Sequence, residues 1–186
     1  MIKGQFPVEK FHSLETPFYY YDMDLLRQTL EAVKKEVGGK KYVVHYALKA
    51  NANDRILDII KGYGLGADCV SGNEVKLAVK AGFPAAKIVY AGVGKSDKEI
   101  KAALNAGIFG VNCESIPEIS VINDLAGKMG QKAKISLRIN PDIDAHTHKY
   151  ISTGRKEDKF GISPWMFQGV VDMMALCKNI EFIGLH

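Results

Sequence analysis

Residues 66–91 read GADCVSGNEVKLAVKAGFPAAKIVYA, a short apolar run, a segment of helical period and a second apolar run. Ser71 and Glu74 have the spacing of an N-terminal capping box, which predicts a helix over 72–81. Gly82 follows the last apolar position of that helix, where a left-handed residue commonly ends it. The run at 87–91 is rich in β-branched and aromatic residues and the run at 66–70 ends in Val70, so the stretch predicts a strand, a helix and a second, parallel strand.

The same alternation continues through the chain and predicts an α/β protein. We expect strands over residues 42–47, 66–70, 87–91, 108–111, 134–139 and 180–185. We expect helices over residues 24–37, 54–61, 72–81, 97–106, 116–129 and 164–178. Capping-box spacings at Ser96 with Glu99 and at Ser115 with Glu118, a proline at Pro164, and stop signals at Gly38, Gly107 and Gly130 support these helices.

Repeated units of this kind require right-handed crossovers and a parallel sheet, which closes into a barrel or stays open and doubly wound. A (β/α)8 TIM-type barrel has eight strands and about 250 residues. The chain has 186 residues, and the sixth predicted strand reaches its last residues. We therefore expect an incomplete (β/α)8 barrel that forms one domain over residues 1–186.

Composition excludes several functional classes. The chain is 47% hydrophobic with a formal charge of +4, and its basic residues are interleaved with acidic ones, so we expect neither a nucleic acid nor a membrane as partner. It contains no signal-peptide pattern and no run of about 18 apolar residues. Cys69, Cys113 and Cys177 fit neither a CxxC motif nor a disulfide framework, so we expect a cytoplasmic location.

In a barrel, alternate strand residues face the lumen and functional side chains lie at the carboxyl ends of the strands. The lumen-facing sets that alternation predicts are Val43, His45, Ala47 and Lys49; Gly66, Asp68 and Val70; Ser136, Arg138 and Asn140; and Phe182, Gly184 and His186. The opposite residues of the fifth strand, Ile135, Leu137 and Ile139, would meet the helices. Lys49, Asp68, Arg138 and His186 would then converge at one mouth.

Two interpretations of this convergence stay open. In the first, Lys49 and Arg138 pair with Asp68 in a structural ion network without chemistry. In the second, Lys49 is a nucleophile that forms a Schiff base, because partial burial beside the cation of Arg138 would lower its pKa from about 10.4.

Two loops are candidates for a functional role. Segment 140–163 has no periodic pattern and is longer than usual for such a connection, so we expect a lid or substrate loop at the mouth. Its His146 and His148 lack a third cluster with ligand spacing, so no metal site is expected. The stretch GVGKS at 92–96 is not a P-loop, because Val89 stands where the first glycine would be, and Ser96 is explained as a helix cap.

Several motifs resemble one enzyme family. Residues 45–51, HYALKAN, resemble the pyridoxal phosphate lysine motif of the fold type III, alanine racemase-like decarboxylases. Residues 138–148, RINPDIDAHTH, followed by YISTG at 150–154 and KFG at 159–161, resemble the diaminopimelate decarboxylase family in particular. Further similarities are GADCVS at 66–71 with Glu74, NCES at 112–115 and GLH at 184–186.

The resemblance implies a role for each matching residue. Lys49 would be the catalytic lysine that carries pyridoxal 5'-phosphate, Arg138 would contact the cofactor near its ring oxygen, and Asp68 would orient the lysine and cofactor. His186 would be the first histidine of the family's GLHxHIGSQ stretch, two positions before the one that stacks on the cofactor ring. The substrate loop would contribute Asp144, His146 and Ile151.

The resemblance also implies an activity, which is decarboxylation of meso-2,6-diaminopimelate to L-lysine and CO2, the last step of lysine biosynthesis. The family acts as a homodimer and has a C-terminal β-domain. The family's residues for the cofactor phosphate, ring nitrogen and distal substrate carboxylate would follow residue 186, so we expect residues 1–186 alone to be inactive. Two alternatives are a decarboxylase of ornithine or arginine and a non-catalytic homologue of the barrel.

Overall fold

The computed structural model describes residues 3–141 and 160–186, in which six parallel strands form one sheet in the order β1-β2-β3-β4-β5-β6. The strands are β1 (His45–Ala47), β2 (Gly66–Cys69), β3 (Ile88–Tyr90), β4 (Gly110–Cys113), β5 (Ala133–Leu137) and β6 (Ile180–Leu185). The α-helices are α1 (Val8–Phe11), α2 (Met23–Val37), α3 (Asp54–Gly62), α4 (Gly72–Lys80), α5 (Asp97–Asn105), α6 (Ile116–Lys128) and α7 (Phe167–Ala175). The 3-10 turns are η1 (Leu48–Ala50), η2 (Ala85–Lys87) and η3 (Pro164–Met166).

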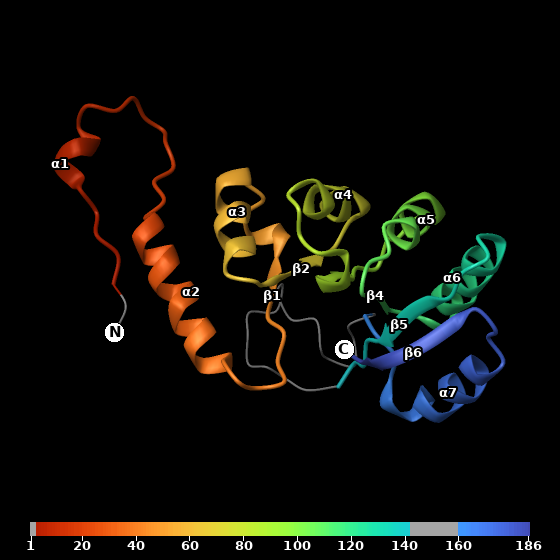
Figure 1. Cartoon of the computed structure of the whole chain (residues 1–186). Helices are drawn as coiled ribbons and strands as arrows, with labels where there is room; N and C mark the ends of the chain where they lie inside the picture. Colours follow the sequence, from red (N-terminus) through yellow and green to blue (C-terminus); the bar gives the residue numbers. More distant parts are fainter. Residues whose placement is uncertain (1–2, 142–159) are drawn as a thin grey trace.

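The strand order equals the chain order, which is the arrangement of a barrel wall rather than of a doubly wound sheet. Helices α3 to α7 follow one another around the outer side of the sheet, and α2 lies beyond α3 beside the N-terminal segment (Figure 1). Among the described residues β1 pairs only with β2 and β6 only with β5, so the sheet is not closed. The predicted incomplete barrel is therefore confirmed.

The pairing register separates an apolar face from a polar one. Ile135 lies beside Val111 and both are completely buried, whereas the next residue of each strand, Ser136 and Asn112, forms a pair on the opposite face. The helix-facing strand residues form one core with the apolar faces of the helices: Ala67, Cys69, Ile88, Tyr90, Val111, Cys113, Ile135 and Leu137. Successive side chains of a strand point to opposite faces, so the residues between these buried ones face the lumen, and the polar groups lie there.

Strand β6 departs from simple alternation. Phe182 pairs with Ile135 and Gly184 with the next residue, Ser136, so Ile183 is an extra residue in a β-bulge. Phe182 therefore lies on the helix side, and the prediction that it faces the lumen is wrong. Ile183 takes a lumen position instead, whereas Gly184 lines the lumen as expected.

The capping-box predictions have mixed outcomes. The Ser71 hydroxyl accepts the Glu74 N–H at 3.2 Å, and Glu99 accepts the Ser96 N–H at 3.0 Å, so both residues begin helices as expected. Ser115 is the N-cap residue of α6 as expected, but the capping box is wrong there, because its side chain forms no cap hydrogen bond. Its partner in the sequence pattern, Glu118, binds other groups, which belong to the site described below.

The predicted helix stops are confirmed at Gly82, Gly107 and Gly130, whose φ angles are 82°, 64° and 66°. Helix α2 also ends just before Gly38 as predicted, but Gly38 has a φ of −57°, and the left-handed residue is Gly39, with a φ of 73°. No helix in the described ranges is both long and apolar enough to cross a membrane.

Substituting Ser71→Ala removes a cap hydrogen bond, so we expect the free energy of unfolding to fall by about 1 kcal/mol. Ser115→Ala is a matched control, because the Ser115 hydroxyl caps nothing. Urea unfolding of the two variants measures the difference. Equal losses would contradict the assignment of Ser71 as the functioning cap.

Candidate functional site

Lys49 does not lie on a strand. Strand β1 ends at Ala47, and Lys49 follows in turn η1, so the prediction that it continues the alternation of Val43, His45 and Ala47 is wrong. Turn η1 packs against β2, and Leu48 anchors it in the core with 1% exposure. Lys49 itself is exposed, two residues beyond the position that pairs with Asp68. No described residue forms a hydrogen bond or ion pair with its ammonium group.

The lumen side of the sheet contains a cavity of about 340 Å³, within the range of small-ligand sites. The lining residues are His45, Asp68, Val89, Phe109, Asn112, Ser136, Ile183, Gly184, Leu185 and His186. Asp68 and His186 were both predicted to face inward, and the structure brings them to this one cavity. Val70 lies past the end of β2 and does not line it.

The carboxylate of Asp68 has an oxygen that the fold does not satisfy. Within residues 3–141 and 160–186, its Oδ1 atom is buried and has no hydrogen-bond partner. An unsatisfied buried oxygen costs desolvation energy, so its presence needs an explanation, and a role in binding or catalysis is one. The interpretation in which Lys49 and Arg138 pair with Asp68 in a structural ion network is therefore wrong.

Arg138 pairs with Glu114, which was not predicted as a site residue. It follows β5, and its Nη1 atom donates to both carboxylate oxygens of Glu114, at 3.1 and 3.0 Å. Glu114 is 5% exposed and follows β4, whereas Arg138 keeps 26% exposure. The guanidinium also lies 5.5 Å from the ring centroid of Phe160. Arg138 is thus held at the same carboxyl edge of the sheet as Lys49.

A second lysine at this edge is buried and completely paired. The Lys95 Nζ atom donates to Glu118 Oε1 at 2.6 Å, to the Gly92 carbonyl at 2.6 Å and to the Asn112 carbonyl at 2.8 Å. These three bonds use all donors of an ammonium group. The side chain is 1% exposed. Lys95 therefore has no donor left for a phosphate, in agreement with the prediction that this loop is not a nucleotide site.

The sequence contained a partial signal for this cluster. The Ser115 to Glu118 spacing selected Glu118 as a capping residue, but its carboxylate binds Lys95 and accepts the Glu114 N–H at 2.7 Å. A capping pattern and a buried ion pair place glutamate at the same helical position, so the sequence alone did not separate them. Glu114 lies in the motif NCES but had no partner within reach along the chain.

The predicted substrate loop is described only at its ends. Ile162 donates to the Arg138 carbonyl at 2.7 Å, and its own carbonyl accepts the Asn140 N–H at 2.9 Å, so the segment returns to the strand it left. Asp144, His146 and Ile151, for which substrate contacts were predicted, lie outside the described residues. In the ranges that are described, no three His, Cys, Asp or Glu side chains form a metal-binding group.

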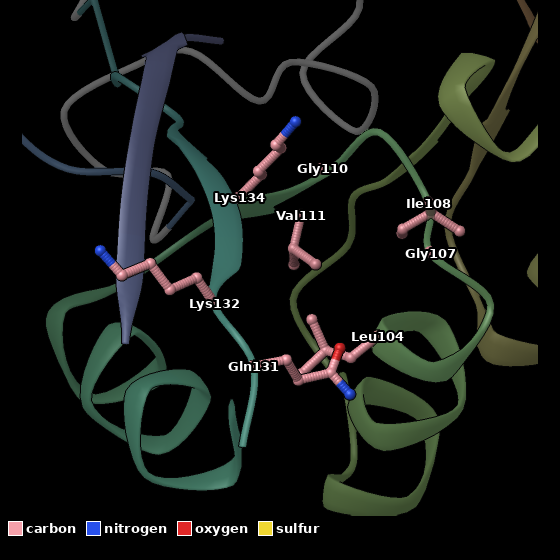
Figure 2. Close-up of a pocket in the computed structure, with 8 residues that line it drawn as sticks. All are labelled: Leu104, Gly107, Ile108, Gly110, Val111, Gln131, Lys132 and Lys134. Atoms are coloured by element: carbon pink, nitrogen blue, oxygen red, sulfur yellow. The ribbon is translucent and has the colours of Figure 1, made fainter. Parts of the chain in front are cut away.

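Another hollow, of about 200 Å³, lies at the opposite, amino end of β4 and β5 (Figure 2). Its polar side chains are Gln131, Lys132 and Lys134, and the two lysine side chains project in different directions (Figure 2). Both lysines are exposed. The hollow has no convergent polar groups and is separated from the carboxyl edge by the length of the strands.

Burial controls the ionisation of the lumen and core groups. Burial lowers the pKa of His45 from its usual 6.5, and the nearby Asp68 carboxylate partly opposes this effect. Burial also raises the pKa of Cys69 to about 12 and moves the pKa of Cys113 upward. At neutral pH neither thiol ionises, so neither is a nucleophile for the site.

Comparison with known proteins identifies close relatives. Residues 23–186 match the pyridoxal-dependent decarboxylase family in its pyridoxal binding domain. Diaminopimelate decarboxylase of Bacteroides thetaiotaomicron is 56% identical over 186 residues, which is 100% of this chain and 48% of that protein. Diaminopimelate decarboxylase of Helicobacter pylori strain J99 is 50% identical over 175 residues, covering 94% of this chain and 42% of that protein.

A solved structure agrees with the sequence comparison. The crystal structure of diaminopimelate decarboxylase from Helicobacter pylori complexed with L-lysine matches with a TM-score of 0.89 and 43% identity. The match covers 96% of this chain and 45% of that one. The chain thus spans about half the length of the relatives it matches.

The pKa of His45 gives a prediction about pH. Because the folded-state pKa lies below 6.5, the unfolded chain takes up this proton first, and the contribution of His45 reduces stability as pH falls from about 6.5 toward the folded value. We expect NMR titration to place the imidazole pKa below 6.5, and Asp68→Asn to lower it further. In His45→Gln, this part of the pH dependence of unfolding should disappear. A His45 pKa at or above 6.5 would contradict the assignment.

The buried pair of Lys95 and Glu118 gives a prediction about stability. We expect Lys95→Met to cost about 3–5 kcal/mol, because it leaves the Glu118 charge without a partner in a buried setting. Lys98→Met makes the same chemical change at an exposed position of the next helix, where we expect less than about 0.5 kcal/mol. Denaturant unfolding measures both. Similar losses in the two variants would show that Lys95 is not stabilising.

Proposed function

The chain belongs to the pyridoxal-dependent decarboxylase family, and we propose that it acts, as the barrel domain of a longer protein, in converting meso-2,6-diaminopimelate to L-lysine and CO2. The carrying observation is the identity of 56% to a diaminopimelate decarboxylase across all 186 residues. The matched crystal structure from Helicobacter pylori is a complex with L-lysine, and this compound is the product of the proposed reaction. Both observations favour diaminopimelate over ornithine or arginine as substrate.

The described residues fit pyridoxal 5'-phosphate. Among the described residues, Lys49 offers an exposed amine without a partner, and Asp68 has an unpaired buried oxygen and lines the cavity of about 340 Å³. Arg138 adds a cation at the same carboxyl edge of the sheet. These groups complement an aldehyde, a positively charged or donating atom, and anionic oxygens. When bound, the cofactor supplies an electron sink for the negative charge left by loss of CO2.

Each of the site residues has a distinct role in the proposed function. Lys49 would hold the cofactor through its amine, which is free for this because no described group engages it. Asp68 would accept a hydrogen bond in the cavity, with the oxygen that the fold leaves unsatisfied. Arg138 would bind an anionic oxygen, and His186 lines the cavity. Asn112 is fixed on the same wall by Ser136, whose hydroxyl donates to its side-chain oxygen at 2.5 Å.

The remaining expectations are also proposals. We infer that a C-terminal β-domain completes the site, because the matched relatives are about twice as long as this chain. The full-length protein would act as a homodimer in the cytoplasm, as the family resemblance implies. Asp144, His146 and Ile151 would contact the substrate from the loop that follows Arg138.

The test is turnover by the full-length protein with pyridoxal phosphate, given meso-diaminopimelate, ornithine and arginine separately. We expect CO2 and L-lysine from the first only. Lys49→Ala should abolish turnover, and borohydride reduction followed by peptide mass mapping should label Lys49 alone in the parent protein. Lys80→Ala alters an exposed lysine and serves as the control. A label spread over other lysines, or turnover retained without Lys49, would refute the assignment.

A further inference from the structure

Four charged side chains form a continuous row along the carboxyl ends of β3, β4 and β5. They are Lys95, Glu118, Glu114 and Arg138, and the row begins in the core and ends at the mouth of the barrel. The two ends differ in exposure, which is 1% at Lys95 and 26% at Arg138. With two cations and two anions, the row is neutral overall. Its most exposed member is Arg138, at the outer end.

The inner half of the row fixes the position of Glu114 through its backbone. Lys95 holds one oxygen of Glu118 at 2.6 Å, and the other oxygen accepts the Glu114 N–H at 2.7 Å. All three Lys95 donors are used, so this pair has no alternative arrangement with equally good bonds. The start of helix α6 is thereby tied to the loop that follows β3.

The outer half fixes the side chain of Glu114. Its Oε1 atom accepts the backbone N–H of Gly92 at 3.2 Å in addition to the contact with Arg138. Gly92 has a φ of 102°, and a Cβ atom there would lie 2.8 Å from the Val70 carbonyl oxygen, so only glycine places this N–H without strain. The carboxylate is held from both sides before it meets the guanidinium.

Glu114 engages only one nitrogen of Arg138. Nη1 donates to both carboxylate oxygens, whereas Nε and Nη2 have no partner among the described residues. A guanidinium carries five N–H donors in a rigid plane, so fixing Nη1 fixes the direction of the other three. Those three donors suit an anionic oxygen such as those of pyridoxal phosphate.

We propose that Glu114 is a positioning residue that orients Arg138 toward an anionic oxygen of the bound cofactor. This inference rests on the proposed function, because it takes pyridoxal phosphate as the ligand. Glu114 would not touch the cofactor, and its whole effect on binding would pass through Arg138. Lys95 and Glu118 would support Glu114 from the core side.

A double-substitution cycle in the full-length protein tests this, with the dissociation constant for pyridoxal phosphate measured by absorbance titration. We expect Glu114→Gln and Arg138→Lys each to weaken binding by about tenfold. The double variant should bind no more weakly than Arg138→Lys alone, because Glu114 acts only through the arginine. Glu36→Gln, at an exposed position of α2, is the matched control and should bind normally.

Additive losses in the double variant, or unchanged binding by Glu114→Gln, would overturn the proposal. Thermal unfolding without cofactor shows whether Glu114 has only a structural role. Lost stability with unchanged cofactor affinity would also overturn the proposal. Glu114→Asp keeps the charge but withdraws the carboxylate by one methylene, and it provides the same comparison if Glu114→Gln does not fold. Intermediate cofactor affinity is expected for it.

Turnover of meso-diaminopimelate by the parent protein separates this inference from the proposed function. A non-additive cycle in a protein that leaves diaminopimelate unchanged would refute the substrate and keep the role of Glu114. Additive losses in a protein that decarboxylates diaminopimelate would keep the substrate and refute the role of Glu114. A parent protein that does not bind pyridoxal phosphate would overturn both.

Discussion

Parallel pairing of the strands is the constraint on which the site depends. When every strand of a sheet runs the same way, all carboxyl ends meet at one edge, however far apart they are in the chain. Lys49 follows β1, Glu114 follows β4 and Arg138 follows β5, so three residues distant in the sequence share this edge. The helices cannot occupy it, because each must pack its apolar face against the outer side of the sheet.

The same constraint explains why charges are buried at this edge rather than in the sheet. Most backbone groups within the sheet are paired with a neighbouring strand, whereas N–H and carbonyl groups at and just past the strand ends are left for other partners. Lys95 uses two carbonyls near the strand ends, those of Gly92 and Asn112, and Glu114 uses the Gly92 N–H. Burial of an ion pair is costly unless its remaining donors and acceptors are satisfied, and here the strand ends supply those partners.

The sequence predicted the fold well because the decisive signals are local. The period of a strand, the capping spacing at Ser71 and the glycine at Gly82 each act within a few residues, and the structure confirms them. The predictions were wrong where a residue distant in the sequence determines the local structure. The bulge at Ile183 depends on the neighbouring strand, and Glu118 left its capping role because Lys95 lies across from it. The Arg138 partner was missed for the same reason, since only the folded sheet brings Glu114 to it.

The two lysines at this edge show how environment separates chemistry from structure. Lys95 and Lys49 carry the same ammonium group, but Lys95 has three hydrogen bonds and 1% exposure, whereas Lys49 is exposed and unpaired among the described residues. A reaction at the Lys95 nitrogen would break an ion pair and two further hydrogen bonds, so its amine is not available as a nucleophile. In the proposed function, Lys49 would lose no such bonds on reaction, so its amine is the better candidate to meet an aldehyde at the mouth. The row of charges that begins at Lys95 therefore removes one lysine from the chemistry and, through Glu114, holds the arginine that an anionic cofactor would require.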